Sequence, residues 1–337
     1  MIFVTGGTGL VGTHLIYELL KRGEKVRAIR RENSKIEKLE KVISYYHTSP
    51  HDLLKNLEWV YADILDVYSL EDAMEGVDRV YHAAAIISFN PSEHQKMIEN
   101  NTRGTANIVN VALHKKIKKI CHVSSIAAVG RDNTKEVVTE IDQWTYSKCQ
   151  SAYAVSKFES EREIWRGIAE GLNAVIVNPS IIFGPGHWGK GSSVIFSRLW
   201  KGLKFYTKGV TGYVDVRDVV ECMIQLMNST YTNERYILNT ENVSYKKLFD
   251  HISHELQKPE PKIYVTKFMS ELAWRLVKAI SMVSGKKPFI TREIARTANK
   301  KYYFSNDKIC TALDFQFRPI EQTIKDTALH FLEDHKK

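Results

Sequence analysis

Two side chains with proton-transfer chemistry, Tyr153 and Lys157, stand four positions apart at the start of a helix expected over 151–170. Side chains at this spacing share one face of a helix, about one turn apart. A phenol has a pKa of about 10, and a neighbouring ammonium lowers that pKa by favouring the phenolate. The pair predicts a tyrosine that acts as general acid or base on a substrate oxygen, although the same spacing also occurs on solvated helices.

Polar side chains that could complete such a site come from two further segments. Ser124 and Ser125 end a strand expected over 120–124, and open parallel sheets place ligands at the carboxyl ends of their strands. Asn101 lies within the long helix expected over 94–114. We treat Asn101 as a catalytic candidate, with bracing of the helix as the alternative, because asparagine side chains often bond locally.

A glycine-rich loop follows the first expected strand and opens the first expected helix. Gly6, Gly9 and Gly12 recur at every third residue. Glycine permits a tight turn, a close approach of backbone N–H groups to a pyrophosphate and close packing of the helix on the strand. The helix N-terminus adds partial positive charge. The loop therefore predicts a dinucleotide site, with contacts that extend over Thr8, Leu10 and Val11.

The end of the second expected strand bears on which dinucleotide binds. A site for NAD commonly has an acidic residue there, bonded to the ribose 2′-hydroxyl. This chain has Arg30 and Arg31, with Glu32 as the nearest acid. A guanidinium can bind a 2′-phosphate through two parallel hydrogen bonds, whereas a carboxylate would repel it. We therefore expect NADP(H), with NAD(H) as the alternative that Glu32 would favour.

These candidates need a scaffold, and the chain alternates expected strands and helices through its first 178 residues. Such alternation indicates crossover connections and a parallel sheet covered by helices on both faces. We expect strands at 2–4, 25–29, 57–62, 79–83, 120–124 and 173–177, and helices at 10–22, 68–75, 94–114 and 151–170. The predicted fold class is α/β, a Rossmann-type doubly wound parallel sheet.

After Gly184 the pattern becomes less even, which indicates a smaller lobe built from insertions. We expect helices at 192–202, 245–256, 267–283 and 320–333, and a strand at 235–239. The predicted organisation is an NADP(H)-binding domain at 1–180, to which 211–242 returns, and a substrate-binding lobe from 181–210 and 243–337.

Composition narrows the class of protein. The chain carries a net charge of +9, but its densest basic run, at 115–119, has no interleaved aromatic residues, so nucleic-acid binding is not expected. No stretch has the roughly 20 apolar residues of a membrane span, and the start does not resemble a signal peptide. The four cysteines lie far apart without CxxC spacing, which predicts reduced thiols and no metal site. We expect a cytoplasmic protein.

Taken in order, several segments carry a resemblance to a known family. They are Thr5–Gly12, Asp63–Ile64, His82–Ala85, Asn101–Thr105, Ser124–Ser125, Tyr153–Lys157 and Asn178–Ser180, and the run at 213–220 extends the match. The chain resembles the extended short-chain dehydrogenase/reductases, which form the NAD-dependent epimerase/dehydratase superfamily. Within it, the chain is most similar to dihydroflavonol-4-reductase-like and 3β-hydroxysteroid-dehydrogenase-like members.

The resemblance implies a role for each matching residue. Tyr153 would exchange a proton with the substrate oxygen, and Ser125 would form a hydrogen bond to that oxygen. Lys157 would lower the pKa of Tyr153 and hold the nicotinamide ribose. The remaining cofactor contacts would come from strand ends: Asp63 and Ile64 at the adenine, Ala83, Ala84 and Ala85 along the middle, and Asn178, Pro179 and Ser180 near the nicotinamide amide, with Ser124 also in contact.

Three activities remain open on this fold. The first, which we expect, is an NADPH-dependent reductase that transfers hydride to a ketone or aldehyde, or acts on the corresponding alcohol in reverse. The second is a nucleotide-sugar epimerase with bound cofactor; dehydratases of the family carry an acidic pair where this chain has Ile126 and Ala127. The third is a non-enzymatic NADP redox sensor, and the presence of both Tyr153 and Lys157 argues against it.

Several later residues have two interpretations each. An apolar substrate wall or a packed core could use Phe89, Trp144, His187, Trp188, Phe205 and Tyr213. A sugar-nucleotide phosphate could bind to Lys190, Arg198, Lys201, Lys204 and Lys208. The amphipathic helix expected at 267–283 could lie on a membrane, but such a face more often covers a core or forms a homodimer contact. No stable membrane association is expected.

Overall fold

A seven-stranded sheet runs through the computed structural model, which describes residues 1–131, 135–147, 150–284, 295 and 297–335. Its strand order is β3-β2-β1-β4-β5-β7-β11, and every neighbouring pair is parallel. The strands are β1 (Ile2–Thr5), β2 (Val26–Arg30), β3 (Leu57–Tyr61), β4 (Arg79–His82), β5 (Lys119–Val123), β7 (Ala174–Pro179) and β11 (Glu234–Leu238). The order reverses between β1 and β4, which is where such sheets bind ligands.

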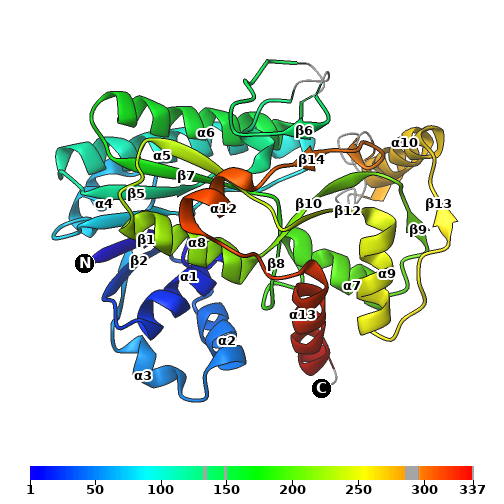
Figure 1. Cartoon of the computed structure of the whole chain (residues 1–337), viewed down its shortest axis with the longest axis horizontal. Helices are drawn as coiled ribbons and strands as arrows, with labels where there is room; N and C mark the ends of the chain where they lie inside the picture. The colour runs from blue at the N-terminus through cyan, green and yellow to red at the C-terminus, as the bar shows by residue number, and fades with distance from the viewer. Residues whose placement is uncertain (132–134, 148–149, 285–294, 296, 336–337) are drawn as a thin grey trace.

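Helices cover both faces of this sheet (Figure 1). One layer holds α1 (Leu10–Lys21), α2 (Glu37–Tyr46), α3 (Pro50–Leu54) and α8 (Val216–Asn228), and the other holds α4 (Val67–Ala73), α5 (His94–His114) and α6 (Ala152–Ala169). The side chains of β1 show why both layers are needed. Ile2 and Val4 pack in one buried cluster and Phe3 packs in the other. The doubly wound α/β fold predicted from the sequence is confirmed.

The chain after β7 builds a second set of elements beside the main sheet. A three-stranded sheet has β10 (Val210–Asp215) between β12 (Glu241–Ser244) and β8 (Ile181–Phe183). Buried Phe183, Tyr213 and Phe331 join this sheet to helices α7 (Val194–Trp200), α9 (Tyr245–Glu255) and α13 (Ile320–His335). The remaining elements are short: two-stranded ribbons of β9 (Phe205–Tyr206) with β13 (Ile263–Tyr264) and of β6 (Val137–Val138) with β14 (Tyr303–Phe304), and helix α12 (Asp307–Leu313).

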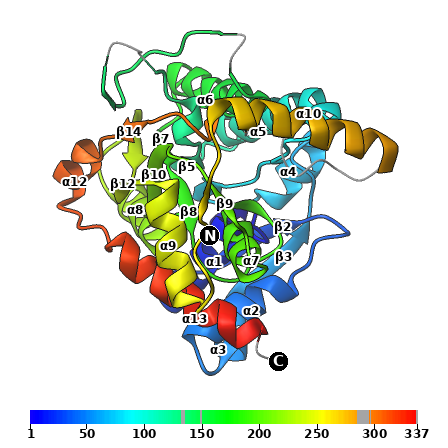
Figure 2. The ribbon, with the colours of Figure 1, turned by 90° about the vertical axis from the view of Figure 1, so that its right-hand side faces the viewer.

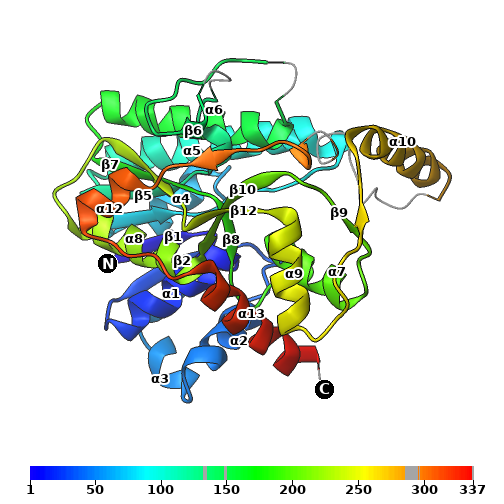
Figure 3. The same cartoon turned by 45° about the vertical axis from the view of Figure 1, so that its right-hand side comes forward.

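Helix α10 (Lys267–Ser284) lies at the outer end of this second part, away from the main sheet (Figures 1 and 3), and it faces the viewer in Figure 2. Its side chains Phe268, Leu272 and Leu276 are exposed. No helix among the described residues is long and apolar enough to cross a membrane. The helix predicted at 267–283 is therefore present. No described part of the chain covers its exposed side chains Phe268, Leu272 and Leu276.

The structure adds elements that the sequence pattern did not predict. Helices α2 and α3 occupy the segment between β2 and β3, and β10 and α8 occupy 210–228. The segment 211–242 divides between two places, since β10 joins the three-stranded sheet while α8 and β11 join the main one. Lys119 helps to hold α8, because its buried ammonium donates to the carbonyls of Leu226 and Ser229 at 2.6 and 2.9 Å. The division into two domains stays a prediction.

Candidate active site

The glycine loop between β1 and α1 has no room for side chains. Gly6 has φ +72°, and a Cβ there would lie 2.7 Å from the backbone of Ala83 and Ala84. A Cβ on Gly12 would lie 2.1 Å from the Gly6 carbonyl oxygen. The Gly9 amide donates to that same oxygen at 2.9 Å, and α1 begins at the next residue. The result is a backbone cradle at a helix N-terminus, which fits a pyrophosphate without any charged side chain.

A buried hydrogen-bond chain fixes the end of β4 against this loop. Thr105 Oγ1 donates to the Asn101 carbonyl, so its oxygen accepts from His82 Nε2 at 3.0 Å. Thr5 Oγ1 accepts from the Ala84 amide and therefore donates to His82 Nδ1 at 2.7 Å. These directions leave one proton on the ring, at Nε2. His82 is therefore a neutral structural link between β1, β4 and α5.

A second buried histidine lies beside the first. The rings of His82 and His122 are 5.1 Å apart, and neither nitrogen of His122 has a hydrogen-bond partner in the described chain. Burial lowers the pKa of His82 to about 3 and the pKa of His122 well below its usual value. Both rings are therefore neutral throughout the neutral pH range.

Acid is expected to destabilise the fold through these rings. Because each pKa is lower in the folded state, the neutral rings stabilise it fully above pH 6.5, and this contribution is lost as the pH falls below that value. Between pH 7 and pH 5 the free energy of unfolding should fall by about 2 kcal/mol for each such ring, measured by urea denaturation. His122→Phe should remove one ring's share, whereas His254→Gln, on the surface, should not. A stability that is constant over this range would contradict the assignment.

The predicted catalytic hydroxyls lie together at the carboxyl end of β5. Ser125 caps the short 3₁₀ turn Ile126–Ala128, and its side chain accepts from the Ala127 amide at 3.1 Å. Helix α6 begins at Ala152, with Ser151 capping it through the Ala154 amide. This start places Tyr153 in the first turn, where the Ser125 side chain acts on its hydroxyl and opposes the rise of its pKa. Two segments 28 residues apart in sequence therefore present adjacent hydroxyls.

Lys157 takes a different partner from the one expected. Its buried ammonium donates to the Val123 carbonyl at 3.0 Å. Burial lowers the pKa of Lys157 to about 8, and the charge of Glu161 opposes that shift. The pKa of Tyr153 is raised, because burial outweighs the hydrogen bond from Ser125. The expected lowering of the phenol pKa is therefore not met in this structure.

Asn101 braces the site from α5. Its amide nitrogen donates to the Ile86 carbonyl and to Ser156 Oγ on α6, both at 2.8 Å, and its oxygen accepts from the Ile86 amide at 2.7 Å. These bonds join the segment after β4 to both long helices. In this structure the Asn101 side chain braces the helices, and a catalytic role for Asn101 stays a prediction.

A buried network beneath Ser125 and Tyr153 was not among the predictions made from the sequence. Ser124 and Asn178 direct side-chain hydrogen bonds to Glu161, at 2.6 and 2.8 Å, and their predicted contact with the cofactor stays a prediction. Glu161 lies on α6 and is 1% exposed. An acidic residue four positions after Lys157 on a buried helix face is a signal that could have identified it. Pro179 is buried, and Ser180 Oγ is buried without a partner in the described chain.

The cofactor residues predicted farther along the sheet differ in their surroundings. Arg30 ends β2, and its guanidinium lies over the Tyr61 ring at 4.2 Å. Its Nε is buried and has no hydrogen-bond partner in the described chain, which fits an anionic group. Asp63 accepts from the Leu65 amide within its own turn. Ile64 packs on Gly104 of α5, where a Cβ would lie 2.4 Å away.

The candidate substrate-wall residues do not form one group. The ring of Phe89 lies 6.1 Å from that of Tyr153, so Phe89 is beside the catalytic pair. Tyr213 is fully buried and stacks on Phe183, and Trp188 packs on Phe331. Trp144 stacks on Phe158 of α6 at 4.4 Å. Phe89 is the residue of the set that the structure brings to Tyr153.

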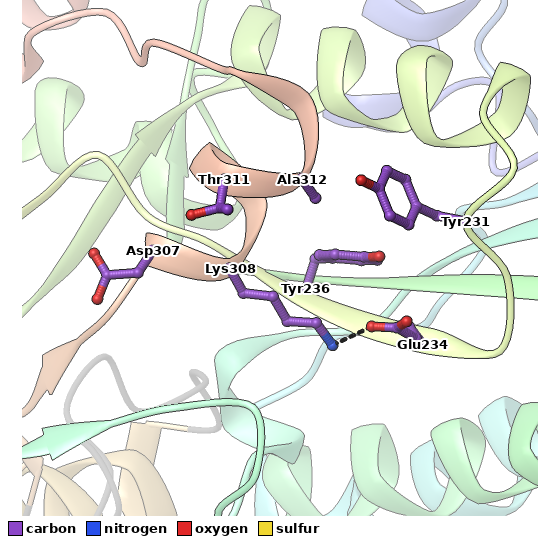
Figure 4. A pocket seen from close by; sticks show the side chains of 7 residues that line it. All are labelled: Tyr231, Glu234, Tyr236, Asp307, Lys308, Thr311 and Ala312. Atoms are coloured by element: carbon purple, nitrogen blue, oxygen red, sulfur yellow. Dashed lines mark ion pairs between the residues drawn. The ribbon is translucent and has the colours of Figure 1, made fainter.

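A hollow at the outer edge of the main sheet is separate from this site. Figure 4 shows it between β11 and α12, where Lys308 forms an ion pair with Glu234 at 2.6 Å. Its lining residues are Tyr231, Glu234, Tyr236, Asp307, Lys308, Thr311 and Ala312. Among the described residues, no group of His, Cys, Asp and Glu side chains could hold a metal ion. Cys121, Cys222 and Cys310 are free thiols, and Cys149 lies outside the described residues.

Curated proteins similar to this chain carry reductase and demethylase names. A putative dihydroflavonol 4-reductase from Synechocystis is 28% identical over 99% of this chain and 94% of its own length. Sterol demethylase protein B from Methylococcus capsulatus is 30% identical over 78% of this chain and 76% of its own. Cinnamoyl-CoA reductase 1 from Petunia hybrida is 27% identical over 97% of this chain and 90% of its own.

Solved structures extend the likeness to the whole fold. The crystal structure of gox2253 matches with a TM-score of 0.82 at 25% identity, over 100% of this chain and 99% of that one. A UDP-glucose 4-epimerase from Thermotoga maritima, solved with UDP-glucose, matches with a TM-score of 0.77 at 19% identity over 99% of both chains, which shows a shared fold. The NAD dependent epimerase/dehydratase family model matches residues 2–239, which include the glycine loop, Ser125, Tyr153 and Lys157. The chain therefore belongs to the NAD-dependent epimerase/dehydratase family, the extended short-chain dehydrogenase/reductases.

Proposed function

We propose that the chain is an NADPH-dependent reductase of a ketone or aldehyde group on a small molecule. The observation that carries this proposal is the placement of Tyr153, in the first turn of α6, beside the side chain of Ser125, with the buried ammonium of Lys157 one helical turn along. Two hydroxyls within hydrogen-bonding reach of each other can both bond one carbonyl oxygen. The pair lies at the carboxyl end of the sheet, as does the glycine cradle.

The protonation state of Tyr153 suits the direction of reduction. Burial raises the pKa of the phenol, so the side chain keeps its proton at neutral pH and can donate it. The bound cofactor would supply a hydride to the carbonyl carbon. As the C=O double bond becomes a C–O single bond, the Tyr153 proton moves to the oxygen. Ser125 and the Lys157 ammonium then stabilise the phenolate that remains.

The surroundings of Arg30 support NADPH as the hydride donor. In the described chain neither Arg30 nor Arg31 forms an ion pair, and Arg30 Nε lacks a hydrogen-bond partner. An unpaired guanidinium stacked on an aromatic ring is well suited to a phosphate. We infer that these two residues bind the ribose 2′-phosphate, while the backbone cradle of Gly6, Gly9 and Gly12 receives the pyrophosphate.

The substrate screen described below also distinguishes two other activities, nucleotide-sugar epimerisation and redox sensing. Ile126 is buried in the turn after Ser125, where dehydratases of the family carry an acid, so proton removal from a neighbouring carbon has no base there. Nucleotide-sugar epimerisation would use the exposed lysines Lys201, Lys204 and Lys208 near α7 for the diphosphate. A redox sensor would bind NADPH without turnover.

The experiment is a substrate screen monitored by NADPH absorbance at neutral pH. A panel chosen from the classes that the relatives' names indicate would hold a dihydroflavonol, a cinnamoyl-CoA, a sterol ketone and UDP-glucose. We expect stoichiometric NADPH oxidation with at least one carbonyl compound and none with a Lys157→Met control. Conversion of UDP-glucose without net NADPH consumption would favour the epimerase instead, and tight NADPH binding without any turnover would favour the sensor.

A further inference from the structure

A buried carboxylate on α6 receives four hydrogen bonds from other side chains. Glu161 Oε2 accepts from Ser124 Oγ at 2.6 Å and from Asn178 Nδ2 at 2.8 Å. Its Oε1 accepts from Trp165 Nε1 at 3.2 Å and from the Arg235 guanidinium at 3.1 Å. A buried carboxylate is costly unless it is paired and hydrogen-bonded, and here both oxygens are fully engaged. The four donors come from four parts of the fold: the residue after β5, and β7, α6 and β11.

The two oxygens serve different parts of the fold. Oε2 faces the catalytic segment, because Ser124 precedes Ser125 and Asn178 Nδ2 also donates to the Ser125 carbonyl at 3.0 Å. Oε1 faces the edge strand, where Arg235 also donates to the Glu140 and Asp142 carbonyls. One carboxylate oxygen therefore holds both strand ends that flank the Ser125 turn.

Charge gives Glu161 a second connection to the site. It lies one helical turn after Lys157, and its charge favours the ammonium form of that residue. The charge of Lys157 in turn helps to keep His82 and His122 neutral, and Tyr153 on the same helix is a protonated phenol. Among the groups that influence Lys157 in the described chain, Glu161 supplies the negative charge.

We propose that Glu161 is a positioning residue of the reductase site: one oxygen fixes the Ser124–Ser125 turn and Asn178, and the carboxylate places a negative charge one helical turn after Lys157. The proposal rests on the proposed function for its kinetic part only. Glu161 contacts neither the Tyr153 hydroxyl nor the Lys157 ammonium among the described hydrogen bonds, so it acts through other residues. Its role follows from what it holds in place, and no proton passes through it.

Glu161→Gln tests the charge while keeping the shape of the side chain. The direct measurement is the titration of Lys157 in protein labelled with ¹³Cε-lysine, with its NMR signal assigned by comparison with Lys157→Met. We expect the midpoint in Glu161→Gln to be lower than in the wild type by about one pH unit. Trp165→Phe is the matched control, because it removes one hydrogen bond to Oε1 and keeps the charge. An unchanged midpoint in Glu161→Gln would overturn the electrostatic part.

Ser124→Ala tests the positioning part separately. This variant removes one hydrogen bond to Oε2 and leaves every charge in place. We expect kcat for carbonyl reduction to fall about fivefold to tenfold, with the Lys157 midpoint unchanged. In Glu161→Gln, kcat should fall further, and the alkaline limb of its pH profile should move to lower pH together with the Lys157 midpoint. Wild-type kcat in both variants would overturn this part.

Two outcomes need further experiments: a Glu161→Gln protein that does not fold, and a wild type that reduces no carbonyl compound. Glu161→Gln leaves the Arg235 guanidinium without its carboxylate, so the double variant Glu161→Gln/Arg235→Gln, which removes both buried charges, repeats the titration if the single variant does not fold. If the wild type reduces no carbonyl compound, the proposed function fails. The Lys157 titration does not depend on turnover, so it still decides the electrostatic part.

Discussion

Tyr153→Phe is expected to lower kcat for carbonyl reduction by about 10²–10⁴-fold, the usual contribution of a positioned general acid. The phenol is the group in this site that can give a proton to a forming alkoxide, since the neighbouring Ser125 hydroxyl holds its own proton far more tightly. The ring itself, which packs beside Phe89 at 6.1 Å, is preserved in phenylalanine. Binding of NADPH should therefore stay within about threefold, measured by fluorescence titration alongside steady-state kinetics.

Tyr146→Phe is the matched control for this prediction. Tyr146 is an exposed tyrosine whose hydroxyl bonds Glu159 on the same helix that carries Tyr153. Loss of that hydroxyl should leave kcat within about twofold of wild type. A Tyr153→Phe protein with full activity would remove the proposed acid, and equal losses in both variants would indicate damage to α6 rather than lost proton transfer.

Arg30→Ala/Arg31→Ala is expected to weaken NADPH binding by about 100-fold while NADH binding changes little. Charge-assisted hydrogen bonds to a phosphate contribute roughly 1.5–3 kcal/mol each, and the second cofactor lacks the phosphate that these residues would bind. The backbone cradle that receives the pyrophosphate is common to both cofactors and is untouched by the change. The ratio of the two dissociation constants, from isothermal titration at low salt, is the quantity that decides.

Arg27→Ala separates this effect from a general loss of positive charge. Arg27 lies on the same strand, but it pairs with Glu58 at 2.7 Å and donates to the carbonyls of Ala73 and Glu75. The Arg27→Ala substitution should leave the ratio of the NADPH and NADH dissociation constants unchanged, even if it lowers the stability of the fold. Tighter binding of NADH than of NADPH by the wild type would contradict the assignment of Arg30 and Arg31 and would direct attention to Glu32.

The parallel sheet could be predicted because its strands are buried on both faces. Apolar runs such as Ile2–Val4 and Ala174–Val177 stand between glycine-rich or charged connections, and all six strands expected before residue 178 are present with ends shifted by at most two residues. Helix α2 was missed because its stripe of Leu39, Val42 and Ile43 is short and set among charged residues. Strand β10 and helix α8 run on without a break at Asp215, so neither period stands out.

The sequence predicts those parts of the site whose local geometry is set by a motif. It does not predict the properties that depend on burial in the folded chain, such as side-chain ionisation. The glycine loop needs glycine for steric reasons that hold in any such turn. The ionisation of Tyr153 depends on how deeply the folded chain encloses it, which spacing cannot reveal, so the expected direction of its pKa was wrong. Glu161 was missed because its partners Ser124, Asn178 and Arg235 are far apart in sequence.

Helix α6 holds the proton donor, its cationic neighbour, the Ser156 anchor of Asn101 and the Glu161 carboxylate on one continuous segment. Because one continuous helix holds these groups, helix geometry alone sets their mutual spacing, while Ser125 and the glycine cradle come from other elements. The residues that would select a substrate belong mostly to other segments. Substitutions in the segment around Phe89 would therefore alter what lies beside Tyr153 without changing the spacing of Tyr153, Lys157 and Glu161.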